Sequence, residues 1–359
     1  MPRSHTPEQP SASTMIRGTA GDRSAVGILP PPRKTTATGS ERRVGVEIEF
    51  AGMETEEAAL AVQDAFGGTI TYVDKYARRV ETDIGAFAVE LDMSRAHPDK
   101  KPGKPALLDE MDTYVSSAVG AIGRYWMPQE IAAPPIPFSR LYIIDDLVAA
   151  LRKRGALGTS ASPIYGFGIH LNPEVPDTSR ETILAHLKAY LLCSDWLHER
   201  IDMDVTRRLM RFVAPLPNSY TRMVVDPDYD PSLPDLMVDY FRFNPTRNRE
   251  FDMLPIFGFI DPRRVRMLSS GKSVSARPTF HYRLPDSRVD RTDWGGIVAE
   301  WNNWVHVEWL ASDADALAAA GRRWAALYDR GRVSEWKHEV ASWLVEPCGT
   351  RSAVDIERA

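Results

Sequence analysis

Alternating apolar and polar residues mark several short segments of the 359-residue chain as strands. In residues 42–50, RRVGVEIEF, apolar side chains alternate with Glu47 and Glu49. Because successive side chains of a strand point to opposite faces, this pattern predicts a strand with one buried face and two carboxylates on the other. The carboxylates would lie roughly 7 Å apart along the strand. Such a polar face is either simply solvated or used for binding.

The same alternation recurs in four later segments, FAVELD (87–92), QEIAAP (129–134), GFGIHLN (166–172) and TFHYRL (279–284). Each segment has one apolar row, which predicts a buried face. The second rows contain Glu90, Asp92, Glu130, His170, His281 and Arg283. Two interpretations stay open: a coincidence of separate solvated faces, or one sheet face on which these side chains gather.

Apolar residues spaced three and four positions apart predict helices in much of the remaining chain. Helices are expected at 55–68, 106–123, 144–158, 177–201, near 233–241, and at 293–311, 314–331 and 334–346. Thr178 and Glu181 match the Thr-x-x-Glu capping box at the start of the helix at 177–201. Strands that mostly precede the helices predict an α+β fold with an antiparallel sheet.

The chain divides by composition into a core and two tails. Residues 1–40 are rich in Pro, Ser and Thr, and this composition predicts a flexible tail. Residues 41–347 are expected to form a single domain, in which about 175–265 is a helical, arginine-rich insertion, and 348–359 form a second tail.

Charge and cysteine content exclude several classes of protein. The net charge is −5 and the pI about 6.0, so no basic excess points to a nucleic-acid partner. No run of 18 apolar residues predicts a membrane span, and no signal peptide is evident. Cys193 and Cys348 are too few for a disulfide framework, which favours a cytoplasmic protein. Neither a P-loop nor a GxGxxG motif occurs.

Carboxylates gathered on one face would need neutralisation. Two of them roughly 7 Å apart repel by about 2 kcal/mol at an effective dielectric constant near 20. Removing Glu47 or Glu49 is therefore expected to leave the metal-free protein as stable as before, or more stable. Carboxylates with imidazoles suit Mg²⁺ or Mn²⁺, and an arginine such as Arg283 suits a phosphate. Cations and a phosphate-binding arginine on one sheet face together predict a site that acts on a nucleotide.

Four motifs in this order resemble the amidoligase family: GVEIEF (45–50), EIAAPPI (130–136), GIHLN (168–172) and a strand of the form x-x-R, here HYR (281–283). That family belongs to the carboxylate–amine ligases of the glutamine synthetase fold. The resemblance implies a curved antiparallel sheet backed by helices, a glutamine synthetase-like catalytic domain. It also implies ATP and Mg²⁺ or Mn²⁺ as cofactors, and small-molecule or peptide carboxylates and amines as substrates.

The resemblance also implies roles for individual residues. Glu47, Glu49 and Arg283 would be catalytic; Glu47, Glu49, Glu90, Glu130, His170 and His281 would hold cations; Arg283, Arg247 and Arg249 would bind the nucleotide; Asp83 and Arg207 would bind substrate. For the arginines at 207, 208, 247 and 249, structural ion pairs are the alternative. The chain departs from the family pattern at Gly168, where a histidine is usual, and at His281, where a glutamate is usual.

The function predicted from the sequence is therefore an ATP- and Mg²⁺-dependent ligase that forms an amide through an acyl phosphate. A guanidino-kinase-like phosphotransferase is the alternative within the same fold. Gly168 and His281 also leave open a catalytically degenerate scaffold, and a metal-dependent hydrolase is a third alternative. The acid, the amine and the oligomeric state do not follow from the sequence.

Overall fold

The computed structural model describes residues 27–91, 128–161, 166–201, 213–245, 248–269 and 274–344. The helix predicted at 106–123 lies outside this part of the chain, as do Asp92, Arg207, Arg208 and Arg247.

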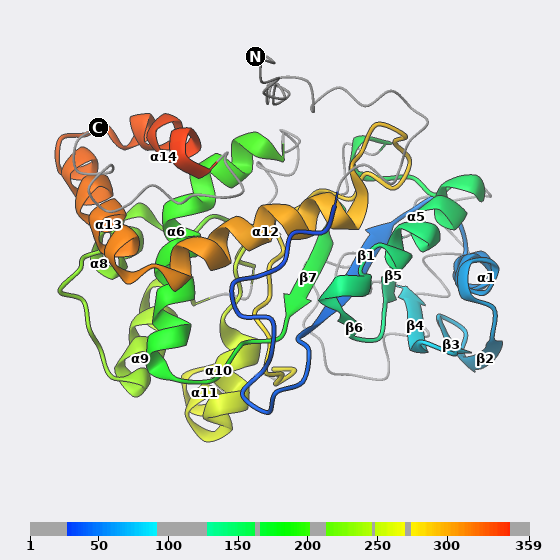
Figure 1. The fold of residues 1–359 in the computed structure, drawn as a ribbon. Helices are drawn as coiled ribbons and strands as arrows, with labels where there is room; N and C mark the ends of the chain where they lie inside the picture. Colours follow the sequence, from blue (N-terminus) through cyan, green and yellow to red (C-terminus); the bar gives the residue numbers. More distant parts are fainter. Residues whose placement is uncertain are drawn as a thin grey trace, which may run out of the picture.

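An antiparallel sheet of seven strands is built around β1 (Arg43–Phe50) (Figure 1). One edge of β1 pairs with β5 (Gln129–Ala132) and β6 (Ile136–Pro137), and the other with β7 (Ile169–Pro173). Beyond β5 follow β4 (Gly85–Leu91), β3 (Ala77–Thr82) and β2 (Thr69–Asp74). The sheet confirms the predicted α+β class with antiparallel pairing.

The segment at 277–285, predicted as a strand, is an irregular extended chain beside β7. Leu171 and Tyr282 exchange both backbone hydrogen bonds, each 2.9 Å long. Pro278 and Pro285 have no backbone N–H to donate, so a continuous ladder cannot form. On its other side, the segment is hydrogen-bonded to residues 250–252. The layer of extended chain therefore continues past β7.

Two helices cover the apolar face of the sheet. α1 (Thr55–Phe66) packs on β3 and β4, where Phe66 stacks on Phe87. α5 (Ile143–Lys153) packs against α1 and α12 (Gly296–Ser312). The apolar rows predicted from the alternation are buried beneath them, with Ile48, Phe87 and Ile131 fully inaccessible. The polar rows lie on the opposite face.

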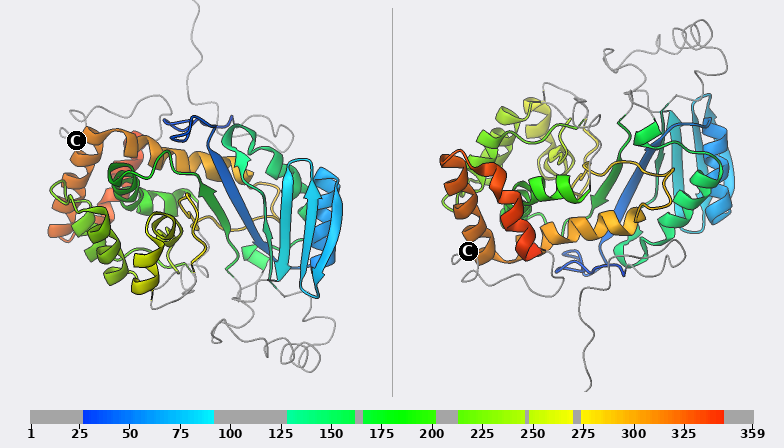
Figure 2. Two further views of the ribbon diagram at one scale, coloured as in Figure 1. Left: turned by 90° about the horizontal axis from the view of Figure 1, so that it is seen from below. Right: turned by 90° about the horizontal axis from the view of Figure 1, so that it is seen from above.

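The other helices lie beyond β7, away from β2 (Figure 2). They are α6 (Arg180–Arg200), α8 (Asn218–Val224), α9 (Leu233–Phe243), α10 (Leu254–Ile260), α11 (Pro262–Leu268), α13 (Ala314–Asp329) and α14 (Trp336–Leu344). The long α6 packs against α12, α13 and α14. Its N-cap is Ser179, whose side chain accepts from the Thr182 amide, so the helix is capped one residue after the predicted Thr178, and Thr182 stands at the position where a capping box needs Glu or Gln.

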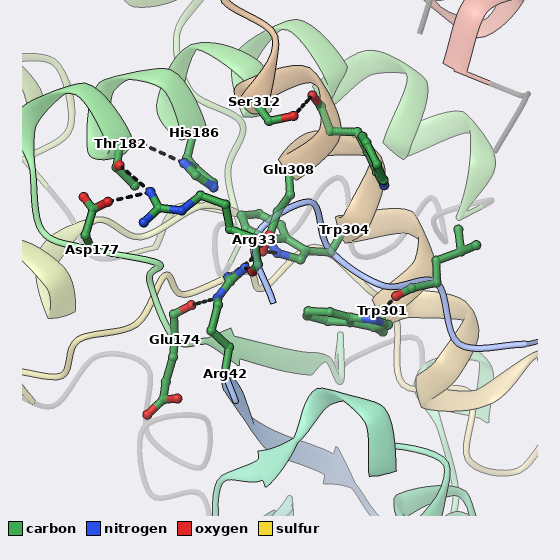
Figure 3. A network of polar contacts seen from close by, with 12 residues as sticks. Arg33, Arg42, Glu174, Asp177, Thr182, His186, Trp301, Trp304, Glu308 and Ser312 are labelled. Atoms are coloured by element: carbon green, nitrogen blue, oxygen red, sulfur yellow. Dashed lines mark hydrogen bonds and ion pairs between the residues drawn. The ribbon is translucent and has the colours of Figure 1, made fainter. Parts of the chain in front are cut away.

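Residues 27–42 pack against α12 and α6 (Figure 3). The Leu29 amide donates to Asn302, and Trp301 donates back to the Leu29 carbonyl. Arg42 and Glu308 form a fully buried pair with two hydrogen bonds of 2.6 and 2.7 Å. The packed chain therefore begins before residue 41, and the predicted boundary of the N-terminal tail is too late. The packed chain begins earlier because the apolar side chains of Ile28 and Leu29 lie against the core.

Candidate functional site

Three glutamates stand side by side across three neighbouring strands. Glu90 on β4 pairs directly with Glu130 on β5, which pairs with Glu49 on β1. Directly paired side chains have Cβ atoms about 5 Å apart and point to the same face. Glu90 is exposed, Glu130 half-buried and Glu49 buried. The register confirms that these carboxylates share a face; that they bind cations stays a prediction.

A second row, two residues along the same face, brings together Glu47 and His170. Glu47 pairs with His170 across β1 and β7, and His170 Nδ1 lies 2.7 Å from Glu47 Oε2. His281, on the segment beside β7, lies with its Nε2 3.8 Å from the same oxygen. Ligand atoms of these three buried residues all lie within 4.8 Å of one another. The predicted cation ligands Glu47, His170 and His281 therefore form one cluster.

His170 also links this cluster to the row of glutamates. Its Nε2 lies 3.5 Å from Glu49 Oε1 and makes no hydrogen bond in the part of the chain that is described. Where the family pattern has a histidine, the backbone amide of Gly168 donates to Glu49 Oε2 at 2.5 Å. Glu49 is thus oriented by a backbone donor, and its other oxygen faces the imidazole.

Burial and charge set the protonation states of this cluster. Burial by itself raises the pKa of Glu47, but the hydrogen bond from His170 and the charges of His170, His281 and Arg277 outweigh it and bring that pKa well below its usual range. Burial lowers the pKa of His170 despite the neighbouring glutamates. The cluster therefore favours an ionised carboxylate beside a neutral imidazole, which are the forms that bind metal.

Three polar side chains of this cluster were not predicted as site residues. Asn172 donates to Glu47 Oε1 at 3.1 Å, and Arg277 Nη1 lies 3.3 Å from the same atom. Asp252, completely buried, has its Oδ2 3.6 Å from His281 Nδ1. Asn172 lies in the polar row of β7 and could have been found from its alternation. Asp252 and Arg277 come from irregular segments without a periodic signal.

Arg283 is held beside the cluster through its backbone. The pairing of Leu171 with Tyr282 places Arg283 opposite His170, and the charge of Arg283 contributes to the lowered pKa of His170, after burial and the opposing effect of Glu49. Its amide donates to the carbonyl of Glu250. The buried Glu250 carboxylate accepts from Ser194 and contacts His198, each at 2.7 Å. This network ties the Arg283 backbone to α6.

The structure separates other predicted residues from this cluster. Arg249 donates to the carbonyls of Pro215 and Phe243, a structural role that leaves its predicted nucleotide contact without support. Asp83 lies in the turn between β3 and β4, about 20 Å along the strand from Glu90 at roughly 3.3 Å per residue. It therefore forms no cluster with Glu90. The predicted residues Arg207 and Arg247 lie outside the described chain.

Comparison with known proteins identifies the family to which the chain belongs. No described helix is long and apolar enough to cross a membrane. No curated protein matches the chain. Residues 40–306, which carry all four sequence motifs and the whole cluster, match the family described as "putative amidoligase enzyme". The match spans well over half of the chain, and the protein belongs to this amidoligase family.

Proposed function

We propose that the protein is an ATP- and Mg²⁺-dependent carboxylate–amine ligase, with a glutamine synthetase-like catalytic domain. The observation that carries the proposal is the concentration of acidic and imidazole ligands on one sheet face. Glu90, Glu130 and Glu49 stand in one row, and Glu47 with His170 in the next. Membership of the amidoligase family supports a ligase, and the proposed reaction is the joining of a carboxylate to an amine.

The residues present fit divalent cations. If a neutral His170 donates from Nδ1 to Glu47, its Nε2 lone pair faces a Glu49 oxygen at 3.5 Å. Two buried acceptors that face each other repel unless a proton or a cation lies between them. Oxygen-rich sites with one or two imidazoles suit Mg²⁺ or Mn²⁺. The six residues that would hold them are Glu47, Glu49, Glu90, Glu130, His170 and His281.

Bound cations would neutralise the phosphates of ATP and the charge that develops during γ-phosphoryl transfer. Arg283 would bind a terminal phosphate, since its guanidinium can grip two phosphate oxygens at once. Asn172 and Arg277 orient Glu47. Cys193 is buried in the core and burial raises the pKa of its thiol, so this cysteine is no nucleophile. The chain's contribution is positioning and charge stabilisation.

The proposed reaction has two steps. A carboxylate oxygen of the substrate bonds to the γ-phosphorus of ATP, the β–γ bridging bond breaks, and ADP leaves. An amine nitrogen then bonds to the acyl carbon, the carbon–oxygen bond to phosphate breaks, and inorganic phosphate leaves as the amine loses a proton. The products are one amide, one ADP and one phosphate per turnover.

A screen for ADP release over a panel of carboxylates with mixed amines, in the presence of Mg²⁺ and ATP, tests the proposal. ADP release that needs both an acid and an amine, and that Glu49→Gln abolishes, supports a ligase. ADP release with a single acceptor and a stable phosphorylated product would instead show a guanidino-kinase-like phosphotransferase. Failure to bind Mg²⁺–ATP would show a degenerate scaffold, and metal-dependent cleavage without ATP a hydrolase.

A further inference from the structure

The imidazole of His281 lies between two carboxylates. Its Nε2 is 3.8 Å from Glu47 Oε2, and its Nδ1 is 3.6 Å from Asp252 Oδ2. The residue is only 6% exposed, and neither ring nitrogen has a hydrogen-bond partner within the described chain. A buried imidazole without hydrogen bonds is costly, so its two nitrogens point to interactions completed when a ligand is bound.

Asp252 is fixed beside His281 by the backbone. The Asp252 amide donates to the His281 carbonyl at 3.0 Å, which joins the two residues across neighbouring extended segments. One carboxylate oxygen, Oδ1, accepts from the Leu254 amide at 3.0 Å, at the start of α10. The other oxygen, Oδ2, is the one that faces the His281 ring. The two oxygens of this buried carboxylate therefore have different neighbours.

The opposite edge of the His281 ring faces the cation cluster. His170 and His281 meet edge to face, with ring centroids 5.2 Å apart, and both imidazoles lie near Glu47. A histidine that binds metal through one nitrogen commonly donates from the other to a carboxylate, which fixes the tautomer and strengthens the ligand. Asp252, His281 and the proposed cation site beside Glu47 follow this order: first a carboxylate, then an imidazole, then the position of the metal.

We propose that Asp252 is a positioning residue for the cation site, acting through His281. Asp252 keeps the His281 proton on Nδ1, so that the Nε2 lone pair faces the cation beside Glu47. It also supplies, from behind the ring, the negative charge that a neutral imidazole lacks. This inference rests on the proposed function, because it requires that the cluster binds a divalent cation.

A structural role for Asp252 is the alternative, because its Oδ1 holds the start of α10. Asp252→Asn separates the two roles. The amide keeps the size of the side chain and one oxygen that can accept from Leu254, but it removes the charge behind His281. His281→Glu is the matched background, because a glutamate carries its own charge and needs none behind it. The double variant closes a thermodynamic cycle.

The experiment is Mn²⁺ binding to the full chain without nucleotide, measured by calorimetry and by the electron paramagnetic resonance of free Mn²⁺. Asp252→Asn is expected to weaken Mn²⁺ binding about 10- to 100-fold in the wild-type background, as losses of such outer partners do. In the His281→Glu background the same change should alter binding less than about threefold. Equal losses in both backgrounds would overturn the proposal, because Asp252 would not act through His281.

A second measurement needs no variant. In the Mg²⁺-loaded wild-type protein, long-range ¹H–¹⁵N spectra should show the His281 proton on Nδ1; a proton on Nε2 would overturn the proposal. Wild-type protein that binds no Mn²⁺ would overturn both the proposed function and this inference. Wild-type protein that binds Mn²⁺, with an Asp252→Asn variant that binds it equally well, would overturn the role of Asp252 alone.

Discussion

Glu47→Gln should destabilise the metal-free protein, the reverse of what the sequence alone suggests. From sequence, removing a carboxylate would relieve repulsion from Glu49. In the structure the nearest partners of Glu47 are attractive: His170 at 2.7 Å, Asn172 at 3.1 Å and Arg277 at 3.3 Å. The lowered pKa of Glu47 leads to the same conclusion: these partners stabilise the ionised carboxylate by more than its burial costs.

The magnitude follows from those contacts. Hydrogen bonds to a charged group are worth about 1.5–3 kcal/mol each, and a neutral amide in its place keeps roughly half of that. Arg277 is 42% exposed, so its ion pair adds no more than about 1 kcal/mol. The expected loss is about 2–3 kcal/mol of unfolding free energy. For a chain of this size that lowers the thermal midpoint by about 3–5 °C.

The assay is thermal and urea unfolding at pH 7 in the presence of a chelator, with Glu90→Gln as the matched control. Glu90 lies on the same sheet face but is exposed, so its substitution should change stability by less than about 0.5 kcal/mol. A Glu47→Gln variant as stable as the wild type, or more stable, would refute the reasoning. Repulsion between carboxylates would then dominate the metal-free site.

The pH dependence has a defined sign. The folded pKa of Glu47 is depressed, so its contribution is complete above its ordinary value of 4.5 and is lost as the pH falls toward the folded pKa. The folded pKa of His170 is also depressed, so protonation below its ordinary value of 6.5 favours the unfolded chain. Both groups make the metal-free protein less stable as the pH falls, and the advantage of wild type over Glu47→Gln should shrink below about pH 4.5.

Three further predictions concern the scaffold and the phosphate. Glu308→Gln should lower the unfolding free energy by about 3–5 kcal/mol because it leaves Arg42 buried without its charge partner, whereas replacing both residues with Met should cost far less; urea unfolding measures both. Deleting residues 1–26 should leave the thermal midpoint unchanged, whereas deleting 1–40 should lower it by several degrees, since Leu29 and its neighbours pack on α12. Arg283→Lys should reduce turnover at least about 100-fold with little change in the midpoint, because an ammonium cannot grip two phosphate oxygens; full activity would remove Arg283 from the phosphate site.

Alternation along the chain was enough to predict the faces of the strands. In β1, β4 and β7 the apolar rows are buried, and Glu47, Glu49, Glu90 and His170 share the other face. The sequence could not predict which residues pair between neighbouring strands, because shifting one strand by any even number of residues preserves the alternation. The sequence therefore predicted one polar row in each strand, left open whether these rows share a sheet face, and could not place Glu90 beside Glu130.

The site residues that lie in irregular segments could not be predicted from the sequence, for a related reason. Asp252 and Arg277 reach the cluster through extended chain whose conformation is set by tertiary hydrogen bonds and by Pro278, not by a local period. Ser179 is the N-cap in place of the expected Thr178, which was predicted from Glu181 three residues later; Ser is the somewhat better N-cap residue, and the capping-box pattern was the misleading signal. The departure at His281 was visible in the sequence, but its buried partner Asp252 was not.

The transfer of one oxygen atom from the substrate carboxylate to phosphate tests the proposed acyl-phosphate mechanism most directly. For an acid–amine pair that releases ADP, the carboxylate is labelled with ¹⁸O, and the phosphate and nucleotide products are analysed by mass spectrometry. An acyl-phosphate ligase transfers one ¹⁸O per turnover to inorganic phosphate, in step with amide and ADP. Labelled AMP with release of pyrophosphate, or amide formed with unlabelled phosphate, would contradict the account.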